Sequence, residues 1–125
     1  MLKLKTIRLY PTLFDLDVVV GGNQREVDEV FLTRYGLTEK TSPNECMTLY
    51  TGTDCELKRT KRIVVRLQSL SRKIIEHECI HVLWHLSQES NIEICYESQE
   101  WQACFIEYVI GEIINPKGYE PYPTI

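Results

Sequence analysis

The residues with the clearest chemical potential form the run Glu76-His77-Glu78-Cys79-Ile80-His81. Two histidines four positions apart lie on the same face of a helix, about one turn from each other, so their rings can converge on one metal ion. Imidazole nitrogens in this arrangement suit zinc. The spacing therefore predicts that His77 and His81 are zinc ligands.

Glu78 completes this chemistry. It follows the first histidine directly, and we expect it to face the same cleft without binding the metal. There it can take a proton from a water that zinc activates and deliver that proton to a leaving amine. We therefore predict that Glu78 is the general base of a hydrolytic reaction. The alternative is a surface helix that is rich in His and Glu by coincidence.

A catalytic zinc site needs a third protein ligand and an open position for water. His85 does not fit, because a helix rises about 1.5 Å per residue and His77 and His85 would lie about 12 Å apart along the axis. We expect His85 to support the site or the packing instead. Cys79 points about 160° to 200° away from the two histidines, which predicts that it packs in the interior.

Glu100 is the expected third ligand. Eighteen residues separate it from His81, and a chain reversal would bring it back over the metal. Glu97 and Glu107 are the alternatives. The other interpretation of Glu100 is a solvated carboxylate in the first turn of a helix, where it faces the positive end of the helix dipole.

The composition sets limits on the class of protein. The chain has 125 residues, is 43% hydrophobic and carries a formal net charge of −4, which fits one globular domain and gives no reason to expect nucleic acid as the main partner. No apolar stretch approaches the roughly 20 residues of a membrane span. Five cysteines without C-x-x-C spacing indicate reduced thiols, so we expect a cytoplasmic protein.

One basic run departs from this overall charge. It could contact phosphates, but we favour a solvated strand face, because no aromatic residues interleave it. The residues of the run are Lys58, Arg59, Lys61, Arg62 and Arg66.

Hydrophobic periodicity predicts an α+β domain over residues 1–125. Residues 1–67 should contain a strand ending at Gly21-Gly22, a helix at 24–35 and a hairpin of strands at 46–51 and 57–67, which gives a mixed or antiparallel sheet of about three strands. Asn23 and Glu26 should form a capping box, and Gly36 should end the helix.

The second half of the chain should be mainly helical. We expect the histidine helix at 69–88, with Ser69 or Ser71 as its cap, a glutamate-bearing helix at 98–114 and an irregular tail at 115–125. In the histidine helix a packing stripe should be formed by Ile75, Cys79, Val82 and Leu86, and the uncharged neighbours, Ile80 among them, indicate a buried helix.

Three stretches carry a resemblance to a known family: Leu9-Tyr10-Pro11 with Val18-Val19-Val20-Gly21, then His77-Glu78-Cys79-Ile80-His81, then Gln99-Glu100-Trp101-Gln102-Ala103. Together they resemble a family of small zincin-like proteins, minimal gluzincins, of tailed phages and prophages. The resemblance covers most of the chain, and its two central motifs are the chemically specific ones. It implies a small zincin-like domain in the cytoplasm of a bacterial host.

The gluzincin resemblance also bears on the roles of single residues. In gluzincins the third ligand commonly opens an E-x-x-A pattern, which Glu100-Trp101-Gln102-Ala103 matches. These enzymes often supply a Tyr or His that steadies the oxyanion, and Tyr96, Tyr108 and His85 are the candidates here.

The motifs are also similar to those of the ImmA/IrrE metallopeptidases, which cleave repressors. The chain differs from them in having Ile80 where they usually place Gly, and in lacking a helix-turn-helix region.

These observations predict a zinc metallopeptidase acting on a peptide or protein, with His77, His81 and Glu100 as ligands and Glu78 as base. The alternative is a non-catalytic binding or assembly protein of a phage or its host that keeps zinc for structure. The sequence carries no signature of the substrate or of the oligomeric state.

Overall fold

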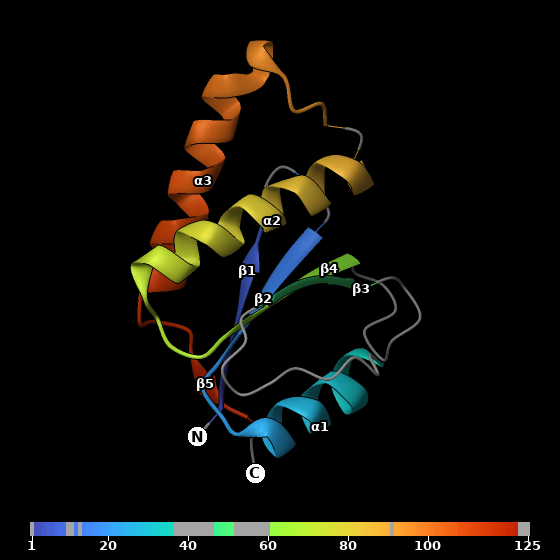
Figure 1. Cartoon of the computed structure of the whole chain (residues 1–125), viewed down its shortest axis with the longest axis vertical. Coiled ribbons are helices and arrows are strands. Elements are labelled where there is room, and N and C mark those ends of the chain that lie inside the picture. The colour runs from blue at the N-terminus through green and yellow to red at the C-terminus, as the bar shows by residue number, and fades with distance from the viewer. Residues whose placement is uncertain are drawn as a thin grey trace.

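The protein is built on a mixed β-sheet that separates one helix from two others, as a computed structural model shows for residues 2–9, 12, 14–36, 47–51, 61–90 and 92–122 (Figure 1). The sheet order is β3-β4-β2-β1-β5. The strands are β1 (Lys3–Arg8), β2 (Phe14–Val20), β3 (Met47–Thr51), β4 (Lys61–Leu67) and β5 (Glu120–Pro121). The helices are α1 (Gln24–Tyr35), α2 (Arg72–Ser90), the short 3-10 helix η1 (Tyr96–Ser98) and α3 (Gln99–Ile114).

The strand pairing confirms the expected α+β class and the expected hairpin. β3 and β4 pair antiparallel, β2 and β4 pair parallel, and β1 pairs antiparallel with both β2 and β5. The prediction of about three strands was too low, because it missed β1 and β5. Residues 57–60 and Cys46, which were assigned to the hairpin strands, lie outside the described residues.

The missed strand β1 has a polar residue where a core residue is expected. Lys5 is buried on the face that carries Ile7, and its ammonium group donates to the backbone oxygens of Glu112 and Asn115 at the end of α3. A cation satisfies the unpaired carbonyls of a helix C-terminus, so this lysine ties α3 to the sheet. The expected irregular tail also contributes structure, since Glu120–Pro121 pairs with β1 as β5.

Both faces of β2 and β4 are buried, which explains the consecutive apolar residues Val18-Val19 and Ile63-Val64-Val65. One core joins the sheet to α2 and α3, and a second joins it to α1. Figure 1 shows α1 on one side of the sheet and the other two long helices on the opposite side. No described helix combines the length and the apolar content that crossing a bilayer requires.

The predicted caps of α1 are confirmed. The side chain of Asn23 accepts from the backbone N–H of Glu26, and the Glu26 carboxylate accepts in return from the backbone N–H of Asn23. Gly36 adopts a left-handed conformation at φ 66° and ends the helix. These local bonds satisfy the free N–H groups of the first turn, so the start of α1 is encoded locally.

The orientation of α2 follows from its packing stripe. Ile75, Cys79, Val82 and Leu86 are completely buried, as predicted, and they face the sheet. The helix follows β4 after a short link, and the Ser71 carbonyl accepts from the N–H of Ile75 at 2.9 Å as an N-cap residue does. The start of the site helix is therefore fixed directly by the end of a central strand.

A buried carboxylate holds α1 to the other face of the sheet. Asp17 in β2 is completely buried, and it accepts from Thr6 at 2.7 Å, from Arg62 at 2.8 Å and from the Tyr35 hydroxyl at 2.6 Å. Burial, followed by the Asp17 charge, raises the pKa of Tyr35, so this phenol stays a donor. Arg62 and Arg66 are both buried, so the interpretation of the basic run as a solvated strand face is wrong for these two residues.

We expect Asp17→Asn to lower the free energy of unfolding by about 3 kcal/mol or more, because it removes the negative charge from a buried pair. Urea denaturation followed by circular dichroism would measure the loss. Asp15→Asn is the matched control: Asp15 lies on the same face of β2, but its side chain is 13% exposed, it bonds Arg8 at 3.2 Å and its contact with Arg62 is longer, at 3.7 Å. A loss of about 1 kcal/mol or less is expected there, and equal losses in the two variants would contradict the assignment.

Candidate metal centre

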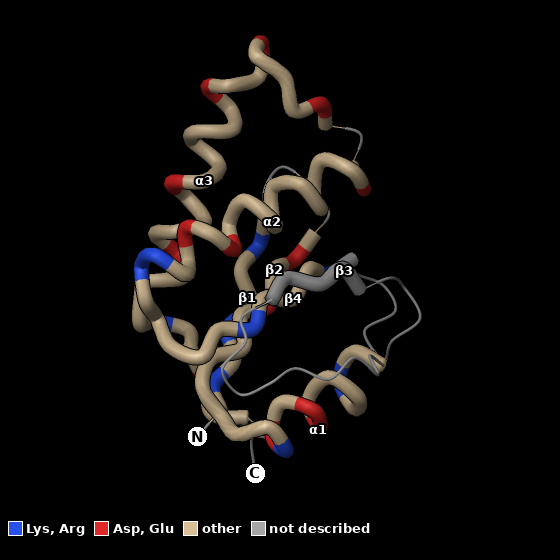
Figure 2. Tube along the Cα trace, viewed as in Figure 1, with Lys and Arg blue, Asp and Glu red and all other residues tan. Residues whose placement is uncertain are grey.

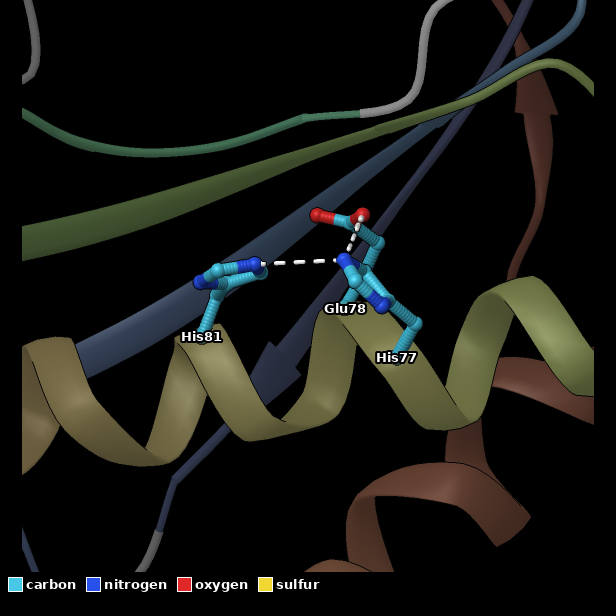
Figure 3. Close-up of side chains that lie close together, drawn as sticks. All are labelled: His77, Glu78 and His81. Carbon is cyan, nitrogen blue, oxygen red and sulfur yellow. Dashed lines mark hydrogen bonds and ion pairs between the residues drawn. The ribbon is translucent and has the colours of Figure 1, made fainter.

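Two imidazole rings face each other one helical turn apart on α2. The Nε2 atoms of His77 and His81 are 3.3 Å apart, and the ring centroids are separated by 5.1 Å. The His77 side chain is 70% exposed. Figure 3 shows both rings turned toward each other on the side of α2 where β3 and β4 run. The pair is thus open to solvent and next to the sheet.

The separation of the two nitrogens matches a shared metal ion. Two nitrogens bound to one tetrahedral zinc at about 2.0 to 2.1 Å are about 3.3 Å apart, and the structure has this separation. The same distance allows a hydrogen bond between neutral rings when one of them donates, because the tautomers are not fixed by heavy-atom positions. The shared metal ion and the hydrogen bond between neutral rings both require the side-chain rotamers that the two histidines adopt in the structure.

Glu78 is the third residue close to the two imidazoles, and it lies on the buried side of the pair. Its carboxylate oxygen lies 3.9 Å from Nε2 of His77, and the residue is 4% exposed. Within the described part of the chain, His77, Glu78 and His81 form the group of potential ligands, with all three ligand atoms within 4.8 Å of one another. The separation of 3.9 Å exceeds the roughly 3.3 Å between two ligands of one tetrahedral ion. Glu78 therefore lies beside the imidazole pair, on its buried side.

The position of Glu78 follows from the geometry of α2. At 100° per residue, Glu78 lies about 60° from Ile75, at the border of the buried stripe, whereas His77 lies about 160° from Ile75. The carboxylate is thus packed against the sheet while the imidazoles remain accessible. Cys79 belongs to the buried stripe, as predicted, and burial first, then the charges of Glu78 and Glu76, raise the pKa of its thiol to about 12. The thiol is outside the described group that could hold a metal ion.

The structure does not bring Glu100 to the histidines. Glu100 is exposed in the first turn of α3 and is not part of the ligand group. In Figure 3 the three site side chains point to one side of α2, and α3 lies on the other. The alternatives Glu97, in η1, and Glu107, in α3, are exposed and outside the group as well. Residues 37–46 and 52–60 are not described, so the ligand set is assigned only for the rest of the chain.

The three candidates for oxyanion stabilisation occupy different places. Tyr108 donates its hydroxyl to the backbone oxygen of Arg8 at 3.1 Å, so it connects α3 with the end of β1. Tyr96 is 79% exposed in η1. His85 is half-buried and lines a cavity that it shares with His81. Of the three, His85 is the one that borders the same cavity as a site residue.

Sequence reasoning missed two residues beside the pair. Ile80 was expected to be buried, but it is 44% exposed, and Trp84 is 61% exposed. Their exposure could have been predicted from their positions on the helix, because they lie about 140° and 180° from Ile75, opposite the packing stripe. Large apolar side chains in these positions make the surface beside His81 unusually apolar.

The helical half of the molecule, which carries the site, is rich in glutamate. Between residues 74 and 116 the chain has no Lys or Arg, and it has eight glutamates: Glu76, Glu78, Glu89, Glu93, Glu97, Glu100, Glu107 and Glu112. Figure 2 shows this half of the molecule marked by acidic positions, with basic ones at the start of α2 and on the strands. Five of these glutamates lie in η1, in α3 or just before them, and Glu76 is paired with Arg72, so the acidic residues are spread over the helical half of the molecule.

Comparison of the chain with protein-family models, with curated proteins and with solved structures finds no match. The fold and the site together define an α+β protein whose helical histidine pair, with an adjacent buried carboxylate, could hold a metal ion.

We expect His77→Ala and His81→Ala each to weaken zinc binding more than about a hundred-fold, because losing even an outer-shell partner of a zinc ligand costs about 10- to 100-fold. Competition with a chromogenic chelator would measure the affinity. His85→Ala is the control, since His85 is on the same helix and outside the ligand group. Equal affinities of the His77 and His85 variants would contradict the site.

We expect Glu100→Gln to keep the zinc affinity of the parent protein, because the exposed carboxylate lies outside the ligand group. The same chelator competition measures it. A loss comparable with that of His77→Ala would instead support the sequence-based assignment of Glu100 as third ligand.

Proposed function

We propose that this protein is a zinc-dependent hydrolase that cleaves peptide bonds. One observation carries the proposal: two solvent-open imidazole nitrogens are 3.3 Å apart, and a buried carboxylate lies 3.9 Å from one of them. Two imidazoles one helical turn apart are two of the three protein ligands of a catalytic zinc site, and the acid next to the first histidine is the base of such a site.

Each residue has a distinct role in this proposal. His77 and His81 hold the ion through Nε2. Zinc, when bound, supplies Lewis acidity and lowers the pKa of a water molecule in its open position. The Glu78 carboxylate would serve as the base, taking up the proton lost by the attacking water and passing it to the leaving amine. Because Glu78 is packed between α2 and the sheet, its carboxylate is held in place before substrate arrives.

A peptide is the substrate that the neighbouring sheet favours. β3 is an edge strand in the described sheet, with β4 as its neighbour, and the site side chains point toward these two strands (Figure 3). The free backbone groups of an edge strand bind an extended chain by main-chain hydrogen bonds. The resemblance of the two motifs to zincin-like proteins agrees with this choice.

A second candidate, a non-catalytic binding or assembly protein with a structural zinc, is favoured by a different observation. The described ligand group has two imidazoles, and Glu100 is not part of it. A structural zinc has four protein ligands and no open position, so it would activate no water. Only the hydrolase requires Glu78 for turnover, so peptide cleavage that is lost when the Glu78 carboxylate is removed distinguishes it from a protein with a structural zinc.

We expect Glu78→Gln to keep zinc and to lower the rate of peptide hydrolysis by about 10²- to 10⁴-fold, the usual contribution of a general base. Cleavage of a quenched fluorescent peptide library by the zinc-loaded protein would measure it. Glu76→Gln is the matched control, because Glu76 is a neighbouring carboxylate that is exposed and paired with Arg72 at 3.0 Å. Parent protein that binds zinc but cleaves no peptide of the library would support the structural-zinc function.

A further inference from the structure

A groove runs along α2 from the histidine pair toward the end of the helix. It encloses about 410 Å³, within the roughly 300 to 1,000 Å³ typical of ligand pockets. Its described lining comes from α2: His81, Trp84, His85, Ser87 and Gln88. Four of these positions follow the spacing i, i+3, i+4 and i+7, so they form one stripe of the helix.

The groove is continuous with the metal centre, because His81 belongs to both. From His81 to Gln88 the helix axis advances about 10 Å, the length of about three residues of an extended peptide. A peptide held at the metal position would therefore place the side chains of neighbouring residues in this groove. At its far end the Gln88 carboxamide offers a donor and an acceptor to a peptide backbone.

The groove presents an aromatic surface. Trp84 is 61% exposed, and Ile80, one turn earlier, is 44% exposed. Binding at an indole ring on the edge of a cavity is most favourable for an apolar group. A pair of aromatic rings contributes about 0.5 to 1.5 kcal/mol beyond the burial of its surface. The surface beside the site therefore favours the burial of a large apolar group.

The described lining of the groove offers no carboxylate to a cationic occupant. Eight glutamates lie between residues 74 and 116, yet none of them is in the described lining of the groove. A zinc ion at the shared His81 would place positive charge at the near end. A lysine or arginine side chain would find no carboxylate among the described lining residues and would face this charge.

We propose that this groove is the specificity subsite of the hydrolase and that it takes a bulky uncharged side chain, with an aromatic ring preferred, within about three residues of the scissile bond. This inference rests on the proposed function, because it takes the histidine pair as the point where the peptide is held. Trp84 is the residue that determines the preference.

The chain has two tryptophans, which allows a direct test. Trp101→Phe keeps an aromatic ring in the stack with Phe105 and leaves Trp84 as the sole indole. In this background, with Glu78→Gln to prevent turnover and with zinc bound, blocked Gly-Phe-Gly, Gly-Ala-Gly and Gly-Lys-Gly peptides are titrated against Trp84 fluorescence. Affinities in Trp84→Ala are measured by calorimetry.

The Phe peptide should shift the Trp84 emission and bind about ten-fold or more tightly than the Ala and Lys peptides. Trp84→Ala should reduce the Phe-to-Ala ratio to about two-fold or less, whereas Leu32→Ala, which removes a 59% exposed side chain from α1, should leave it unchanged. Circular dichroism confirms that each variant is folded.

Equal affinities for the three peptides, no measurable binding, or tighter binding of the Lys peptide would overturn the inference. Zinc content is measured on the same samples. If the protein binds no zinc but still prefers the Phe peptide, the proposed hydrolase is wrong and the aromatic groove is supported. The failure of one proposal can therefore be distinguished from the failure of the other.

Discussion

The packing of one stripe of α2 against the sheet is the constraint on which the site depends. Ile75, Cys79, Val82 and Leu86 are fully buried, so the rotation of the helix about its axis is fixed. Once that rotation is set, the directions of all other side chains follow from 100° per residue. Glu78 falls at the border of the core, and the two histidines fall outside it. The four buried residues thus place the carboxylate at the edge of the core and leave the two imidazoles exposed.

The two faces of the sheet use charge in opposite ways. On the α1 face, Asp17 is saturated by donors from β1, β4 and α1, so its charge has a purely structural role. On the α2 face, the imidazole pair remains accessible, and the nearby Glu76 is paired with Arg72 at the helix surface. A buried charge must be paired where it is, but an exposed pair of imidazoles stays available to a cation.

The exposed apolar residues next to the histidines lie on one side of α2. Trp84 and Ile80 lie opposite the packing stripe, on a part of α2 that neither α3 nor the sheet buries. Keeping such side chains in water is unfavourable, and their position next to the histidine pair is the basis of the proposed role in recognition. Chemistry and recognition would then be arranged along a single helix, from His77 to Gln88.

Features that depend on neighbours within about one turn of helix, or along one strand, could be predicted from the sequence. The spacing of His77 and His81, the caps of α1 at Asn23 and Gly36, and the stripe through Cys79 were all readable, because each involves contacts a few residues apart. The pairing of β3 with β4 was readable for the same reason.

Features that depend on the placement of distant segments required the folded structure. β1 was hidden because Lys5 occupies a core position that makes sense only next to the end of α3. Glu100 matched a motif, yet the direction in which α3 leaves the 92–98 segment keeps it out of the ligand group. The spacing of residues along a chain limits how far apart they can be, but the packing of two helices determines whether their side chains meet.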